Sequence, residues 1–266
     1  LNSTNDVQLG IVNANADNMG PVGNVFVTAD AAVTVTSPLL PVNIMTLMRD
    51  VVTLRNGVGL IADNLAAEDA AGINITAGMA ELRAADGIGD GFHTVNPLLN
   101  PFVTATNDND IDTTIATLAA ANQVVIGGVN MANLASGDIN IQNFGGALIT
   151  LNTVGGTAGI INDAAGDADP ATPGGDISIL NNSPLNIGPG GVTNNNGGNI
   201  TVTANAPGDL TINGSVNANG GAAGDITLIG GTNVNFGVGN TIRTTAPNSM
   251  IDIDAINGNM TGDFRS

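Results

Sequence analysis

The sequence predicts an all-β protein, and more narrowly a solenoid of stacked parallel strands. The 266 residues include 38 Asn, 37 Gly and 21 Asp but only 2 Glu and no Lys, so residues that favour helices are scarce. Hydrophobic residues make up 42% of the chain, which is enough for a continuous core. Short triplets of the form apolar-polar-apolar also recur at a nearly constant interval.

The clearest repeat occupies the last third of the chain. One series of triplets starts at nearly equal intervals, at Ile177, Ile200, Ile226 and Ile251. Two further series lie inside the same period, at Leu185, Leu210, Val234 and, more weakly, at Val192, Val216, Ile242. Three short strands in a period of roughly 24 residues are typical of a parallel β-helix, in which each strand pairs with its equivalent one coil away.

The period extends upstream with interruptions, and we interpret residues 1–266 as one β-helix domain. The same interval separates Ile115 from Ile139 and Val125 from Ile149. Still earlier, the series continues at Val25, Val51 and Ile73. Two longer intervals predict inserted loops at about 87–106 and 153–175. The segment 38–48 departs from the pattern and is predicted to be a short helix or an irregular loop.

An antiparallel β-sandwich is the alternative fold. Short strands with turn residues every 8–12 positions also suit a sandwich. Equivalent positions in this chain match in residue type at one period, however, and antiparallel hairpins have no need of such a match. The sequence therefore favours the solenoid.

Several phrases are more specific than simple alternation. Gly-Asp-Ile-Asn-Ile at 137–141, Gly-Asp-Ile-Ser-Ile at 175–179 and Gly-Asp-Ile-Thr-Leu at 224–228 repeat one pattern, and a longer stretch at 208–221 continues it. This pattern resembles the repeats of filamentous-haemagglutinin-type and autotransporter-like bacterial surface proteins over about residues 113–257. The resemblance implies a right-handed parallel β-helix in an exported, cell-surface or extracellular stalk. The family's N-terminal secretion domain and the autotransporter C-terminal barrel are not recognisable in this sequence.

Charge excludes some classes of partner. The net charge is −18, and five Arg cannot form the basic track that a phosphate backbone requires, so we expect no nucleic-acid partner. No apolar run is long enough for a membrane-spanning helix, so we expect no membrane insertion.

Enzymatic chemistry has little support in the sequence, and we predict a protein that is not an enzyme. The single His93 has no Cys, Tyr or Lys to complete a nucleophile site, and no Ser has a nucleophile-elbow context. Neighbouring acids such as Asp252 and Asp254 are compatible with a polysaccharide-acting β-helix enzyme. The chain lacks the Trp and Tyr on which sugar rings stack, and its charge repels acidic polymers.

Two acidic clusters are calcium candidates, and otherwise no cofactor is expected. Alternating acids at 108–112 would project to one side of an extended chain, and a second group lies in the predicted loop at 153–175. The candidate ligands are Asp108, Asp110, Asp112, Asp163, Asp167 and Asp169. Oxygen ligands on flexible loops suit calcium, although neither segment has the EF-hand spacing. The alternative is that these acids are simply solvated.

A further column of Asx residues is interpreted as structural. Asp138, Asp176, Asn199 and Asp225 each precede the first strand of a period, where the side chain can accept a backbone N–H and fix the turn.

These features predict a structural and adhesive segment of a large exported protein, at the cell surface or outside the cell. One alternative is a self-assembling fibre or sheath subunit, and the other is the β-helix enzyme. The expected partners are further coils of a longer parent chain or copies of the chain stacked end to end, together with surface glycans or cell-surface proteins. Neither end has a recognisable capping element, which is why coil edges are expected to be available for pairing.

Overall fold

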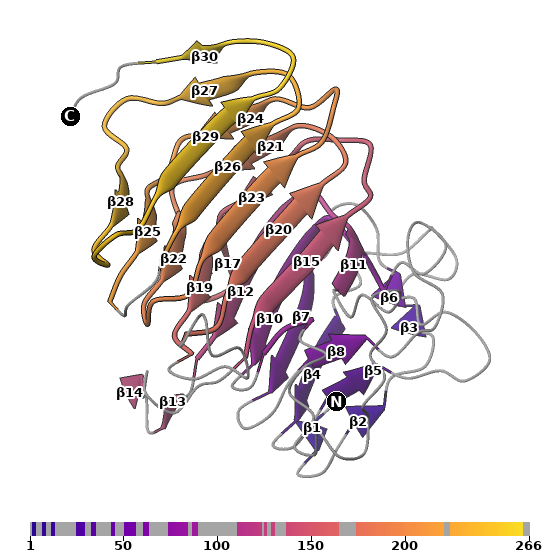
Figure 1. The fold of residues 1–266 in the computed structure, drawn as a ribbon. Helices are drawn as coiled ribbons and strands as arrows, with labels where there is room; N and C mark the ends of the chain where they lie inside the picture. The colour runs from indigo at the N-terminus through magenta and orange to yellow at the C-terminus, as the bar shows by residue number, and fades with distance from the viewer. Residues whose placement is uncertain are drawn as a thin grey trace, which may run out of the picture.

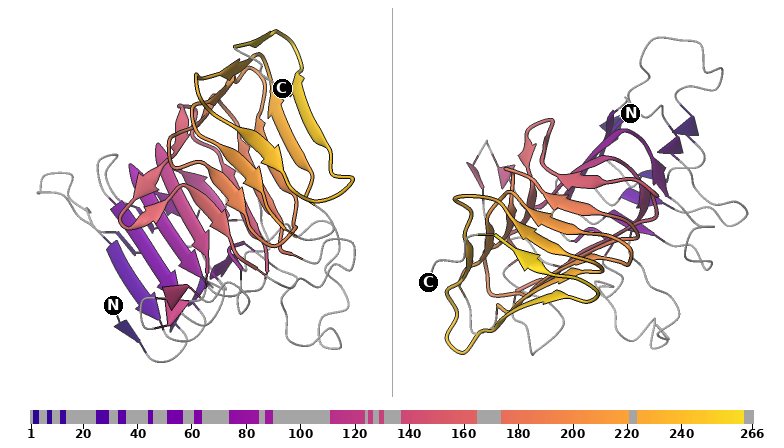
Figure 2. Two further views of the ribbon diagram at one scale, coloured as in Figure 1. Left: turned by 90° about the vertical axis from the view of Figure 1, so that its left-hand side faces the viewer. Right: turned by 90° about the horizontal axis from the view of Figure 1, so that it is seen from above.

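The computed structural model consists of β-strands, and no helix occurs among the residues it describes (Figure 1). Within the first 73 residues it describes the strands alone. Beyond them it describes residues 74–84, 87–89, 111–123, 125–126, 129–130, 137–164, 174–220 and 224–262. The strands follow one another along the molecule from the N-terminal to the C-terminal end in both views of Figure 2.

One sheet of nine strands holds the first strand of every regular repeat. Its order follows the chain, and each neighbouring pair is parallel. The strands are β3 (Val12–Asn13), β6 (Ile44–Met45), β9 (Ile75–Thr76), β11 (Ile111–Thr114), β15 (Ile139–Asn143), β20 (Ile177–Asn181), β23 (Ile200–Ala204), β26 (Ile226–Gly230) and β29 (Ile251–Ala255).

A second parallel sheet of fourteen strands divides in two at β12 (Thr117–Asn122), because its first residues pair with β16 and its last with β19. The undivided part contains β1 (Asn2–Ser3), β4 (Val25–Ala29), β7 (Val51–Asn56) and β10 (Met79–Ala84). One branch contains β16 (Ile149–Leu151), β21 (Leu185–Ile187), β24 (Leu210–Ile212), β27 (Val234–Phe236) and β30 (Met260–Thr261). The other contains β19 (Ile160–Asn162), β22 (Val192–Asn194), β25 (Val216–Ala218) and β28 (Ile242–Thr244).

The remaining strands form smaller units. A third parallel sheet contains β2 (Val7–Gln8), β5 (Val33–Val35) and β8 (Ile61–Asp63). Two antiparallel hairpins join β13 (Val125–Ile126) to β14 (Val129–Asn130) and β17 (Thr153–Val154) to β18 (Thr157–Ala158).

The regular part is a stack of layers. Each of the segments 139–176, 177–199, 200–225 and 226–250, which we call layers, contributes one strand to the nine-stranded sheet and one to each branch of the fourteen-stranded sheet. The first strands pair at the positions predicted from the repeat, with Ile177 opposite Ile200, and Ile226 opposite both Ile200 and Ile251. The stacked parallel strands thus form a solenoid-like β fold.

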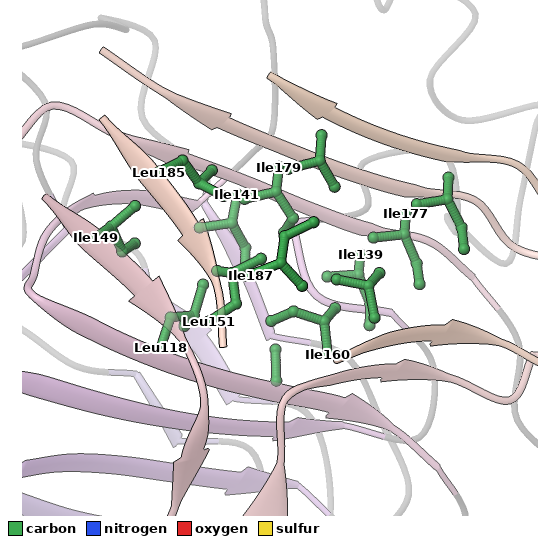
Figure 3. Packing of buried hydrophobic residues seen from close by; sticks show 14 of the residues in the cluster. Leu118, Ile139, Ile141, Ile149, Leu151, Ile160, Ile177, Ile179, Leu185 and Ile187 are labelled. Atoms are coloured by element: carbon green, nitrogen blue, oxygen red, sulfur yellow. The ribbon is translucent and has the colours of Figure 1, made fainter. Parts of the chain in front are cut away.

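Inward Ile, Leu and Val side chains form the core between the sheets. Strand β20 is typical, because Ile177 and Ile179 are 1% exposed while Ser178 between them faces outward and is half-buried. Figure 3 shows such residues from several strands pointing toward one another, among them Ile141, Ile160 and Leu185. Fully burying one such side chain contributes about 1.5–3 kcal/mol, so the repeated columns supply the main stabilisation.

Upstream of the regular layers, several predicted registers are wrong. The spacing predicts that Ile115 aligns with Ile139. Instead, Ile111 of β11 pairs with Ile141 of β15. Val125 turns into an antiparallel hairpin instead of pairing with Ile149. Val25 pairs with Val52, one residue from the prediction, and Ile73 lies outside the described residues. Neighbouring aliphatic residues make these registers ambiguous in sequence, because a shift still matches an apolar residue to an apolar one.

The predicted irregular segments also contain strands of the stack. Ile88, inside the loop predicted at 87–106, is fully buried and bridges Ile61 and Ile139; residues 90–106 lie outside the described residues. The loop predicted at 153–175 contains the hairpin β17–β18 and then β19, which pairs with β12 and β22. In the segment 38–48, strand β6 pairs with β3 and β9. Two or three residues suffice to pair across such layers, and so short a strand leaves little signal in sequence.

Candidate functional site

The inward position at the end of the first strand, which we call the first corner, carries an amide in two layers. Asn143 and Asn181 are fully buried and in register. Nδ2 of Asn143 donates to Oδ1 of Asn181 at 2.7 Å, and Oδ1 of Asn143 accepts the backbone N–H of Ile115 at 2.9 Å. Asn181 Nδ2 in turn donates to the carbonyl of Pro184 at 2.7 Å. The amides therefore satisfy backbone groups that strand pairing leaves free at a turn.

The inward position at the end of the third strand, which we call the last corner, also carries a column of buried amides. We call such a column an amide ladder. Asn122, Asn162 and Asn194 are fully buried and in register on β12, β19 and β22. Nδ2 of Asn122 donates to Oδ1 of Asn162 at 3.1 Å. Asn162 Nδ2 donates to the carbonyls of Gly137 and Asp176 at 3.2 and 3.1 Å. Each amide thus links the third strand of one layer to the start of another.

The Asx column, predicted to fix the turn before each first strand, instead bonds from one layer to the next. Oδ1 of Asp176 accepts the backbone N–H of Asn199 at 2.6 Å, and Oδ1 of Asn199 accepts that of Asp225 at 3.0 Å. Asp225 continues the series to Met250 at 2.7 Å, and Asp138 begins it with Asp176 at 2.6 Å. Each side chain caps the equivalent residue of the next layer, so the column helps to set the register of stacking.

Asp163, a predicted calcium ligand, is fully buried in an amide network. Gln123 Nε2 donates to its Oδ2 at 2.7 Å, and Asn195 Nδ2 donates to its Oδ1 at 2.5 Å. Asn219 Nδ2 extends the chain to Asn195 Oδ1 at 3.1 Å. This carboxylate is therefore one member of a column of polar side chains that runs outside the last corner.

Of the other calcium candidates, the structure describes Asp112, which does not lie beside Asp163. Asp112 lies in β11 of the other large sheet and is 1% exposed; its backbone N–H donates to Asn74 Oδ1 at 2.8 Å. Asp108, Asp110, Asp167 and Asp169 lie outside the described residues, as does His93. Where the structure is described, no three acidic or histidine side chains gather at a possible metal site. The calcium site stays a prediction.

Sequence reasoning did not identify Glu81 as a special residue, yet its carboxylate is buried on the outer face of β10. The hairpin β17–β18 covers it: the Thr157 hydroxyl donates to Oε1 at 2.8 Å and the Gly156 N–H at 3.2 Å. Gly155 has φ +61°, and a Cβ there would collide with Glu81 Oε2. The scarcity of Glu in the sequence was the one available signal, because it sets Glu81 apart from the many solvated Asp residues.

Amides on the outward side of the regular layers cross-link neighbouring layers. Asn205 Nδ2 donates to Asn182 Oδ1 at 2.8 Å, and Asn213 Nδ2 donates to Asn186 Oδ1 at 2.9 Å. Both pairs join neighbouring layers at exposed positions. They fix amide donors and acceptors on the outward side of these layers.

Apolar surface is concentrated on the last described strands. Ile251 is 41% exposed, whereas its equivalent Ile226 is fully buried. Other exposed large hydrophobic residues near these strands are Met260 in β30 and, outside the strands, Val238, Met250 and Ile256. Within the described residues, β28, β29 and β30 pair on one side only, which leaves one row of backbone groups on each without a strand partner.

Comparisons with known proteins add no relative: no family model matches the chain, and neither curated proteins nor solved structures gave a significant match. The described residues also contain no helix long and apolar enough to span a membrane.

Proposed function

We propose that the chain is a structural and adhesive rod segment of an exported bacterial surface protein. In this proposal it is a right-handed parallel β-helix with three short strands in each coil of roughly 24 residues. One observation carries the proposal: the in-register pairs along the first strand, from Ile177 to Ile251, recur at a nearly constant interval. A repeat that preserves its register adds length at about 4.8 Å per coil without changing its cross-section.

The mechanism would be mechanical. Pulling along the rod loads parallel strand pairs together with the Asx column, and both are repeated in every layer. The outward amides and hydroxyls are suited to surface glycans or to polar patches of cell-surface proteins, whose contacts are hydrogen bonds. The net charge of −18 opposes lateral clumping of the rods.

Surface location is the sharpest test of this function. An antiserum raised against the chain should label intact cells of the source organism, and mild protease treatment of those cells should remove the label. Detection only after lysis would overturn the proposal. An array of immobilised glycans and matrix proteins, probed with the purified chain, then tests adhesion separately from location.

A self-assembling fibre or sheath subunit is a second candidate, favoured by the exposed edge of β28, β29 and β30. In this candidate, a second copy adds its first strands to that edge, head to tail, so that all pairing stays parallel. Electron microscopy and light scattering should then show filaments that Ile251→Lys combined with Met260→Lys abolishes. Val238→Lys is the matched control, because Val238 is 92% exposed but lies in a turn outside the edge strands. A chain that stays monomeric at high concentration would exclude this candidate and leave the rod proposal intact.

A further inference from the structure

Four Asn-Gly pairs lie in the part of the chain that the structure describes, each just after a strand. They are Asn196-Gly197, Asn213-Gly214, Asn219-Gly220 and Asn257-Gly258. In such a pair the backbone nitrogen of the glycine can attack Cγ of the asparagine, because glycine has no Cβ to hinder the approach. Ammonia leaves and a cyclic imide forms, which water opens to an acid. The side chain must rotate and the turn must move, so the fold decides which pair reacts.

Asn213 is exposed, yet stacking restrains its turn. Its Nδ2 donates to Asn186 Oδ1 at 2.9 Å, and Gly214 is buried. A Cβ on Gly214 would collide with the carbonyl of Gly188, so this backbone packs directly against the preceding layer. The strand before the turn, β24, pairs with both β21 and β27, which leaves the turn little freedom to move.

Asn219 and Asn196 are restrained by other hydrogen bonds. Gly220 N–H donates to Thr245 Oγ1 at 2.8 Å, which holds the nitrogen that would attack Asn219. Asn196 Nδ2 donates to the backbone carbonyl of Asp163 at 2.7 Å, and the glycine that follows Asn196 is buried. Each of these pairs would have to break a bond inside the stack before it could react.

The pair Asn257-Gly258 lies in the turn between β29 and β30, and both of its residues are exposed. Among the described residues, β29 pairs only with β26 and β30 only with β27, so stacking restrains this turn from one side. Asn257 Nδ2 donates to the carbonyl of Gly231 at 3.0 Å, and no acceptor for the Gly258 N–H lies among the described residues. The attacking nitrogen is therefore accessible to water, and the side chain has to release its bond to Gly231 to react.

We propose that Asn257 is a site of spontaneous deamidation, at which the folded chain reacts faster than at the other three pairs. Water or hydroxide removes the proton of the Gly258 nitrogen, which bonds to Cγ of Asn257 while Nδ2 leaves as ammonia. Water then cleaves one of the two C–N bonds that hold the imide nitrogen. Cleavage at Cγ gives aspartate, and cleavage at the main-chain carbonyl gives isoaspartate. Either product has an acid in place of the donor Nδ2, so the bond to the Gly231 carbonyl is lost. This inference does not depend on the proposed function.

Reaction rates at the four pairs test the inference. The purified chain is kept at mildly alkaline pH, where hydroxide accelerates the reaction, and digests are analysed by mass spectrometry. We expect Asn257 to react several-fold faster than Asn213, which is also exposed and also precedes a glycine. In concentrated urea the two should react at similar rates, because unfolding removes the restraint on Asn213. Equal rates in the folded protein would overturn the proposal, and so would the same preference for Asn257 in urea.

A matched pair of variants tests the assignment separately. Deamidation adds a negative charge, so ion-exchange chromatography separates the product from the fresh protein. The parent chain carries Asn56→Gln, which removes a fifth pair whose glycine lies outside the described residues. Asn257→Gln keeps an amide but would have to close a larger ring, so acidic product should accumulate several-fold more slowly than in the parent. Asn213→Gln should keep the parent's rate. Accumulation at the parent's rate in Asn257→Gln would overturn the proposal.

Discussion

The layers at 139–199 and those at 200–250 stack in the same way but close their corners differently. The earlier layers place Asn143 and Asn181 at the first corner, where the later ones have Ala204 and Gly230. At the last corner the same change occurs between Asn194 and Ala218. Inward Ile, Leu and Val columns run through both regions without a break.

The buried amides are confined to the first two of these layers. Asn143 and Asn162 lie in the layer 139–176, which also carries the hairpin at 153–158, whereas Asn181 and Asn194 lie in the layer 177–199, which has no such hairpin. Asn162 Nδ2 bonds to the carbonyls of Gly137 and Asp176. A buried amide is stabilising only when its bonds are complete, and it then fixes a turn that pairing alone cannot. In the layers 200–225 and 226–250, where the ladders have ended, small side chains such as Ala204, Ala218 and Gly230 occupy the corners. Buried amides therefore occur in both an irregular and a regular layer, and stacking does not require them in every layer.

The largest effect is expected from a charge in the column that both regions share. Ile226→Asp should destabilise the protein by more than about 4 kcal/mol, because the carboxylate would be buried without a partner. Thr201→Asp is the control, since Thr201 faces outward and its partners in the neighbouring layers, Ser178 and Thr227, are uncharged. Urea unfolding measures both. An Ile226→Asp protein with wild-type stability would show that the inward column is wrongly assigned.

Removal of an amide corner should come next. Asn162→Ala removes the hydrogen bond to the carbonyl of Gly137 and the one from the N–H of Ala164. We expect this loss to lower the free energy of unfolding by about 3 kcal/mol. Asn217→Ala, on the outward side of β25, should cost less than about 0.5 kcal/mol. Similar losses in the two variants would contradict the difference drawn between corner and surface amides.

Substitution of Glu81 tests how its buried carboxylate holds the hairpin β17–β18, which lies in the earlier region alone. Glu81→Ala removes the acceptor of Thr157 and Gly156 and should release residues 153–158, at a cost of about 2 kcal/mol. Hydrogen exchange should then rise in the hairpin and stay unchanged in β23 and β26. Glu81→Gln retains an acceptor and should keep most of the protection. Uniform loss of protection along the chain would mean that Glu81 supports the whole fold.

The smallest effect concerns the Asx column, which the two regions share. Asp176→Ala should cost about 1 kcal/mol, because Asn199 N–H loses its side-chain acceptor at a half-buried position. Asp176→Asn should be close to wild type, since Asn199 fills the same role in the next layer. Thermal unfolding of the two variants distinguishes them. Equal melting temperatures would indicate that the column is a surface feature without influence on stacking.

Residue composition and repeat spacing alone determined the all-β class, the parallel stacking and the partners of Ile177, Ile200, Ile226 and Ile251. The positions of the Asx column were also predictable, because its members precede a strand in each period, but their bonds to the next layer were not. These features are local or strictly periodic, so the residue pattern behind each of them recurs along the sequence.

The upstream registers and the buried polar network were decided only in the tertiary structure. Inserted residues change the spacing between Ile139 and its true partner, and neighbouring aliphatics fit several alignments equally well. An Asn at a corner looks the same in sequence as an Asn in a turn. Asn162 becomes a buried ladder residue, and Asp163 an acceptor from Gln123 and Asn195, because segments far apart in the chain stack at about 4.8 Å and exclude water between them.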